Sequence, residues 1–219
     1  ASLYGVGTVL TQRVMKASLP FPHTATLGLA VVLACGGLLN LLGLAYGITL
    51  DALALAGLAL AFITFKQQGI HRDRLQAFLK PGFLPVLLVF IALSALHAWL
   101  FSSPEAFNYH DDMEKYLAHP ARMLATGTLG GSSFNALGTE TFGGQAFLHA
   151  FVLTHFDLPF VNTVDSVFAV ILCLLMIVSF YPRAQLPWLT IPLVMLMFVM
   201  LPDNYVNTSA VYTGVAFTI

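Results

Sequence analysis

The sequence predicts an all-α fold: a polytopic helical membrane protein with about five to six transmembrane helices plus extracytoplasmic surface helices. Of the 219 residues, 58% are hydrophobic and only 9% are charged, and the mean hydropathy is +0.84. Soluble domains carry about 25% charged residues, so this chain has too little polar surface to face water on all sides. The apolar residues also gather in runs of about 20, the length that crosses a bilayer as a helix.

Charge and cysteine content narrow the functional classes. The formal net charge of -1 provides no basic surface, so we expect no nucleic-acid partner. Cys35 and Cys173 each lie within a separate apolar run, which favours small packing residues over a disulfide. We treat residues 1–219 as a single transmembrane domain, with an N-terminal helical hairpin region (1–82) and a second region (83–219).

The hairpin region contains two predicted spans. Residues 1–12 are apolar but too short to cross a bilayer, and we expect Pro20 and Pro22 to break the chain after them. The first predicted span is residues 26–46, whose end reads GLAYG; we interpret this GxxxG pattern as general tight packing. The second is residues 48–65, joined to the first by almost no loop.

The polar loop at 66–80 sets the predicted orientation. It holds four basic residues against the single acid Asp73, which by the positive-inside rule places it in the cytoplasm. The third predicted span, 83–101, then runs outward, and loop 102–145 becomes extracytoplasmic. We expect a bacterial inner membrane, with loop 102–145 in the periplasm.

The outer loop is predicted to contain a surface helix at 112–126. Asp111 or Asp112 would cap its start, Gly127 would stop it, and His119-Pro120 would interrupt or kink it.

A glycine-rich loop follows at 127–144, a composition that suits a segment ordered by a ligand. Residues 147–156 predict a helix too short to cross the membrane. Spans are predicted at 160–181 and, shorter, at 188–201. Residues 209–219 look like the first half of another span, so we expect the chain to be part of a longer polypeptide.

The candidate functional site is the segment FNYHDDMEKY at 107–116, which follows the third predicted span. It brings together His110, Asp111, Asp112 and Glu114. Ionisable groups beside hydrocarbon are costly and usually functional, which favours a catalytic or ligand-binding role. The alternative is that the two aspartates only cap a helix and mark the outer side of the membrane.

Metal and haem interpretations carry less weight. The acids of this segment, with His110 and His119, could ligate a divalent metal, but no HExxH or CxxC spacing is present. His97, His149 and His155 lie near predicted spans, yet lone histidines there are more often hydrogen-bonded packing residues than haem ligands. The cofactor therefore stays unknown.

Three segments resemble the GT-C class of membrane glycosyltransferases, which use polyprenyl-phosphate-linked sugars. They are YHDDMEKY at 109–116, GGQAFLHAF at 143–151 and NTSAVYTGVAF at 207–217, and the likeness is greatest to bacterial multi-pass members. It covers about residues 83–219; the two preceding spans are extra relative to the commonest layout of the class.

The resemblance implies a site on the outer side of the membrane. A carboxylate of the first outer loop acts there as general base on an acceptor hydroxyl, or binds a metal, and this role falls on Asp111 or Asp112. We favour Asp111 for the chemistry and Asp112 for structure or metal. Lys115 and Arg122 are the cations available for the lipid phosphate, and His110 and Glu114 lie close to them in sequence.

Two functions remain open on the sequence alone. One is a sugar transferase whose partners are membrane lipid and a polyprenyl-phosphate sugar. The alternative is a non-catalytic transmembrane subunit or scaffold of a larger membrane complex.

Overall fold

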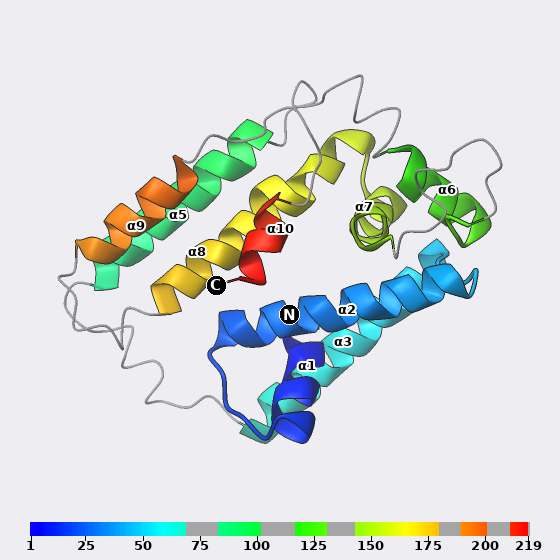
Figure 1. The fold of residues 1–219 in the computed structure, drawn as a ribbon. Helices are drawn as coiled ribbons and strands as arrows, with labels where there is room; N and C mark the ends of the chain where they lie inside the picture. The colour runs from blue at the N-terminus through cyan, green and yellow to red at the C-terminus, as the bar shows by residue number, and fades with distance from the viewer. Residues whose placement is uncertain (69–82, 102–116, 131–142, 180–188, 201–210, 219) are drawn as a thin grey trace.

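A computed structural model describes residues 1–68, 83–101, 117–130, 143–179, 189–200 and 211–218. All regular structure in these residues is helical, which confirms the predicted all-α class (Figure 1). Within them, four helices are long and apolar enough to cross a membrane: Phe21–Leu41, Gly47–Gln67, Phe83–Leu100 and Phe160–Ser179. The chain is therefore a helical membrane protein.

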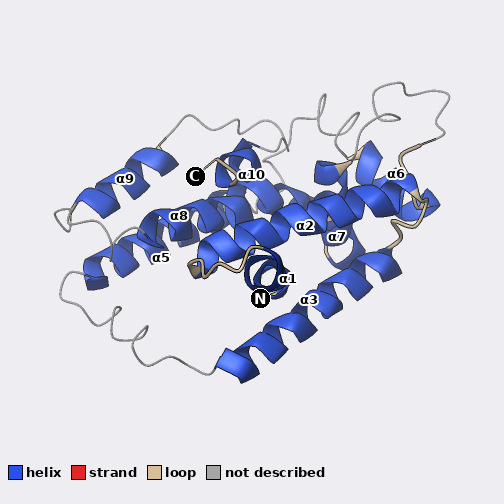
Figure 2. Cartoon of the chain, turned by 60° about the horizontal axis from the view of Figure 1, so that its bottom comes forward, coloured by secondary structure: helices blue, strands red, loops and turns tan. Residues whose placement is uncertain are grey.

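The N-terminal region is a helical hairpin with a third helix packed into it. Helix α2 (Phe21–Leu41) and helix α3 (Gly47–Gln68) form the hairpin. Helix α1 (Ser2–Val9) continues into a π-helical segment, η1 (Leu10–Val14). Figure 2 shows α1 nearly end-on between α2 and α3. Most of residues 1–12 thus pack against the two hairpin helices.

Glycines allow α1 to approach both hairpin helices this closely. A Cβ atom on Gly7 would overlap the carbonyl oxygen of Thr24 in α2, and one on Gly5 would overlap the carbonyl oxygen of Gly57 in α3. Gly28 is equally restricted by the carbonyl oxygen of Leu3. Small residues permit such backbone contact between membrane helices.

Two details of the hairpin differ from the sequence prediction. Helix α2 begins at Phe21, five residues before the predicted start, with Pro22 in its first turn. Proline is tolerated there because the first N–H groups of a helix have no partner within it. The two glycines of GLAYG do not lie within one helix: Gly43 (φ +69°) lies in the turn between the helices, and Gly47 begins α3, where a Cβ atom would lie 3.1 Å from Cγ2 of Thr154.

The second region contains a second group of packed helices. Helix α5 (Phe83–Phe101) has the bounds predicted for the third span. The fourth span is Phe160–Ser179. Most of it consists of the π-helical segment η4 (Val164–Ala169), which continues directly into helix α8 (Val170–Ser179). Helix α9 (Thr190–Val199) packs beside α5, as Figure 1 shows. It is ten residues long, and the ends of the predicted span 188–201 reach into residues that are not described.

Short helices cover one end of the hairpin. Helix α6 (Ala118–Thr126) starts after Leu117; the first part of the predicted helix, 112–116, lies outside the described residues. Pro120 lies in its first turn instead of interrupting it. The predicted stop at Gly127 is confirmed: this residue has φ +77° and ends the helix.

Helix α7 (Gly144–His155) confirms the short helix predicted before the fourth span. Its 12 residues reach about 18 Å, too little to cross the hydrocarbon core. A 3₁₀ helix, η3 (Leu158–Asn162), connects it to η4. Both α6 and α7 lie at the end of the bundle where α2 turns into α3 (Figure 1).

An apolar contact joins the two regions. Ala25 and Leu29 of α2 pack with Leu172 and Cys173 of α8, and with Ala216 of the short helix α10 (Val211–Ala216). Cys35 and Cys173 are both free thiols.

Candidate functional site

Arg122 is the one predicted site residue that lies within the described part of the chain. His110, Asp111, Asp112, Glu114 and Lys115 all lie outside the described residues. The candidate site is therefore built outward from Arg122 in α6.

Arg122 is half-buried and partly bonded. Its Nη2 donates a hydrogen bond of 2.8 Å to the carbonyl oxygen of Gly130, because the chain folds back over the end of α6 at Gly127. Its Nε is buried and has no acceptor among the described residues. A guanidinium carries five N–H donors in a fixed fork, so Arg122 retains donor capacity for an anionic ligand.

Asn40 fixes this fold-back loop to the hairpin. Its buried Oδ1 accepts hydrogen bonds from the backbone N–H of Leu129 (2.7 Å) and from the hydroxyl of Thr128 (3.4 Å). The turn after α2 adds a second tie, since the N–H of Ala45 donates to the carbonyl oxygen of Gly127 at 2.8 Å. The end of α6 is thus held at a defined position against the α2–α3 turn.

The start of α7 packs against the same fold-back loop and Asn40. Gly143 has φ +70°, and a Cβ atom there would lie 2.9 Å from Leu129 and 3.4 Å from the side-chain amide of Asn40. Two residues later, Gln145 bonds the Nε2 atom of His149 at 2.9 Å.

His149 is a neutral imidazole inside the protein. Its side chain is 1% exposed, and its Nδ1 atom has no partner among the described residues. Burial lowers the pKa of His149 to about 4, because a charged imidazolium loses its hydration there. Burial also lowers the pKa of His119 in α6.

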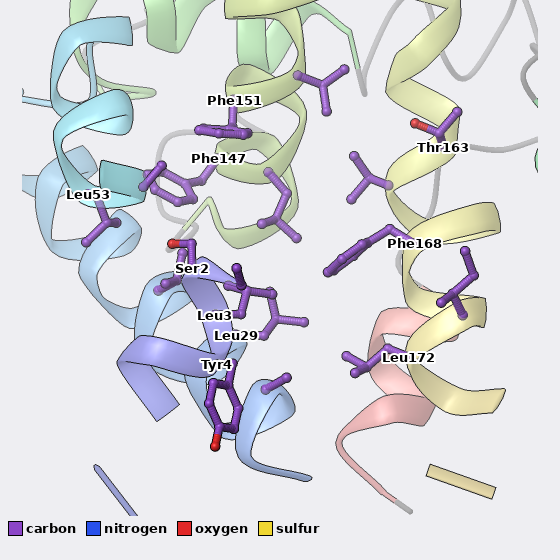
Figure 3. A pocket seen from close by; sticks show the side chains of 18 of the residues that line it. Ser2, Leu3, Tyr4, Leu29, Leu53, Phe147, Phe151, Thr163, Phe168 and Leu172 are labelled. Carbon is purple, nitrogen blue, oxygen red and sulfur yellow. The ribbon is translucent and has the colours of Figure 1, made fainter. Parts of the chain in front are cut away.

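An apolar cavity of about 510 Å³ lies between the hairpin and α7 and α8. Figure 3 shows Leu3 and Leu29 below it, Phe147 and Phe151 above it, and Phe168 reaching in from the opposite side. The wall is almost entirely hydrocarbon and comes from α1, α2, α3, α7, η4 and α8. Helix α7 thus borders the cavity with Phe147, Leu148, Phe151 and Val152, while Gln145 and His149 lie elsewhere around the same helix.

Comparison of the chain with protein-family models, curated proteins and solved structures gave no match.

The three histidines considered for haem have separate surroundings. His97 Nδ1 lies 2.9 Å from the carbonyl oxygen of Ser166, His149 bonds Gln145, and His155 bonds Asp51. Among the residues that the structure describes, no group of three His, Cys, Asp or Glu side chains could hold a metal ion. The metal interpretation of residues 110–114 is not tested by this, because those residues are not described.

Sequence reasoning missed a buried carboxylate in the fourth span. Asp165 accepts hydrogen bonds from the backbone N–H of Tyr212 (3.0 Å) and from both the N–H and the hydroxyl of Thr213 (2.7 Å each). It thereby ties α10, part of the NTSAVYTGVAF segment, to η4. The signal was available, since a lone acid within a run of apolar residues is costly in a membrane and needs a partner.

Proposed function

We propose that the chain belongs to a membrane glycosyltransferase-like protein that transfers a sugar from a lipid-phosphate donor on the extracytoplasmic side. The observation that carries this proposal is the two-sided environment of α7. One part of its surface lines an apolar cavity of about 510 Å³, and its N-terminal turn packs beside the loop that holds Arg122. An amphiphilic donor, with a hydrocarbon chain and a phosphate, matches such an arrangement.

The cavity suits the hydrocarbon chain of the donor. It is bordered by candidate membrane spans, where hydrocarbon rather than water is the surrounding medium. Lipid tails are as apolar as leucine, so burial from water contributes little here and the fit of the chain to the wall decides binding. Phe147, Phe151 and Phe168 provide that shape.

The phosphate would be contacted by Arg122. Charge-assisted hydrogen bonds from a guanidinium to phosphate are among the strongest polar contacts, and its Nε is not used by the described residues. Lys115 is the second cation assigned to this role, and His110 and Glu114 stay candidate ligand contacts.

Asp111 would supply the base. Its carboxylate takes the proton of an acceptor hydroxyl, the hydroxyl oxygen forms a bond to the anomeric carbon, and the bond from that carbon to the lipid phosphate breaks. Asp112 would then stabilise the local structure or bind a metal.

Lipid binding tests the two halves of the site separately. Ala54 lines the cavity, so Ala54→Phe places an aromatic ring in it; Ala52→Phe, at an exposed position on the same helix, is the matched control. Overpacking costs about 1–3 kcal/mol, so Ala54→Phe should weaken binding of a polyprenyl phosphate by about five- to 150-fold, while Ala52→Phe leaves it unchanged. Equal effects of the two substitutions would contradict the assignment of the cavity.

The Arg122→Gln variant distinguishes binding of the lipid phosphate from binding of the lipid hydrocarbon chain. It should weaken binding of polyprenyl phosphate by about tenfold or more and leave binding of the phosphate-free polyprenol unchanged. Equal loss for both lipids would remove Arg122 from the phosphate site. Tight binding without turnover in the full-length protein would favour the alternative, a non-catalytic transmembrane subunit.

A further inference from the structure

Three exposed basic residues lie toward one end of the hairpin, away from the candidate functional site. Arg13 lies in the last turn of η1, Lys16 follows it in the connection to α2, and Lys66 lies in the last turn of α3. We call these three residues the basic patch. The fourth Lys or Arg of the described residues, Arg122, lies in α6 at the other end of the hairpin (Figure 1).

Aromatic contacts bring together the segments that carry the basic patch. The ring of Tyr4 in α1 stacks on the ring of Phe21, the first residue of α2, at a centroid distance of 5.0 Å. It also stacks on the ring of Phe65 in α3 at 5.5 Å. Phe65 directly precedes Lys66, and Phe21 follows five residues after Lys16. The start of α2 and the end of α3 therefore meet around Tyr4, so the basic patch lies at the boundary of two candidate membrane spans.

The connection from η1 to α2 exposes apolar side chains beside its basic ones. Val14 and Met15, which lie between Arg13 and Lys16, are 70% and 50% exposed. Lys16 has φ +51°, the left-handed conformation, where the chain leaves η1. An exposed segment with both apolar and basic side chains suits the boundary between hydrocarbon and lipid head groups, where each kind of side chain meets a matching medium.

The acids of the described residues lie away from the basic patch. They are Asp51, Asp157 and Asp165. Asp51 lies near the start of α3, at the opposite end of that helix from Lys66, and the other two lie between the end of α7 and the start of α8. The patch is therefore a surface of positive charge, which is complementary to an anionic partner.

We propose that the basic patch binds the phosphate groups of anionic phospholipids at this boundary of the membrane. Its three cations contact the phosphates, and Val14 and Met15 contact the acyl chains just below. Loop 66–80, which starts at the patch, is the loop whose charge predicts the cytoplasmic side, so the lipids belong to the cytoplasmic leaflet. Each basic residue near an anionic lipid surface strengthens binding by about fivefold.

Quenching of tryptophan fluorescence by brominated phospholipids in vesicles tests this proposal without any donor lipid or turnover, so its outcome does not depend on the proposed function. With the other tryptophans of the chain replaced by phenylalanine, Met15→Trp places the probe within the patch. Brominated phosphatidylglycerol, which is anionic, should quench it at lower mole fractions than brominated phosphatidylcholine, which has no net charge. Trp99, 75% exposed near the end of α5, is the matched probe away from the patch and should show no such preference. Equal quenching by both lipids at position 15 would overturn the proposal.

Variants identify the residues responsible. Arg13→Gln, Lys16→Gln and Lys66→Gln should each lower the preference for phosphatidylglycerol by about fivefold, and the triple variant should abolish it. The charge-conserving Arg13→Lys, Lys16→Arg and Lys66→Arg are the matched controls and should keep it. The preference should also disappear in about 1 M salt, where the Debye length falls to about 3 Å. A preference that survives in high salt would overturn the proposal, even if the triple variant failed to fold.

Discussion

The carboxylate of Asp165 should be the strongest single tie between α10 and the rest of the bundle. It accepts three hydrogen bonds, one from Tyr212 and two from Thr213, at 2.7 to 3.0 Å. Asp165 is 5% exposed, so water does not replace these bonds when the side chain is removed.

The structure predicts a graded series of stability losses. Asp165→Ala removes all three bonds from a buried site, each contributing about 1 kcal/mol or more, so the free energy of unfolding should fall by about 3 kcal/mol or more. Thr213→Val removes one bond at constant shape and should cost about 1 kcal/mol. Asp165→Asn keeps one acceptor oxygen and should fall between the two.

Unfolding of the full chain in mixed micelles with increasing SDS measures these losses. Ser179→Ala is the control, because its hydroxyl bonds the carbonyl oxygen of Met176 within its own helix, at 2.7 Å. It should cost less than any change at Asp165. An Asp165→Ala variant as stable as Ser179→Ala would refute the assigned role of the carboxylate.

Three further predictions concern packing, pH and orientation. Gly28→Leu should displace α1, because any Cβ there overlaps the carbonyl oxygen of Leu3, and a protease-accessibility assay should show α1 released. The lowered pKa of His149, about 4, means that the unfolded chain binds a proton below pH 6.5 while the folded chain does not; the free energy of unfolding should therefore fall by about 2–3 kcal/mol between pH 7 and 4.5, and His149→Gln should remove this dependence. An impermeant thiol reagent should label a cysteine at Ser132 but not one at Asp73 in intact cells; the reverse pattern would contradict the predicted topology.

Much of the helical architecture could be predicted because apolar runs have a length that the bilayer fixes. The run at 83–101 has no competing signal and became α5 with the predicted bounds. The start of α2 was misplaced because Pro22 is a helix breaker in most positions but not in a first turn. Local residue preferences alone could not show whether Pro22 ends a helix or lies in the first turn of one.

The contacts between helices could not be predicted, because they depend on partners distant in the sequence. Gly5 and Gly7 gave no pattern of their own, yet they allow α1 to pack between α2 and α3. Asp165 and Thr213 are 48 residues apart, and only the folded chain shows that they bond. Arg122 was predicted as a ligand contact only from a resemblance. The structure adds a physical reason for that role, because the Nε of Arg122 is buried and has no acceptor among the described residues.

Sugar transfer by Asp111→Asn and Asp112→Asn variants of the full-length protein tests the proposed function most directly. Asparagine keeps the shape of the side chain and its hydrogen bonding but removes its basicity. With a polyprenyl-phosphate sugar as donor, Asp111→Asn should lower the rate by about 10² to 10⁴ while the protein stays folded. Asp112→Asn should mainly lower stability. Full activity in both variants and in the double variant would contradict the account and leave the two acids as markers of the outer side of the membrane.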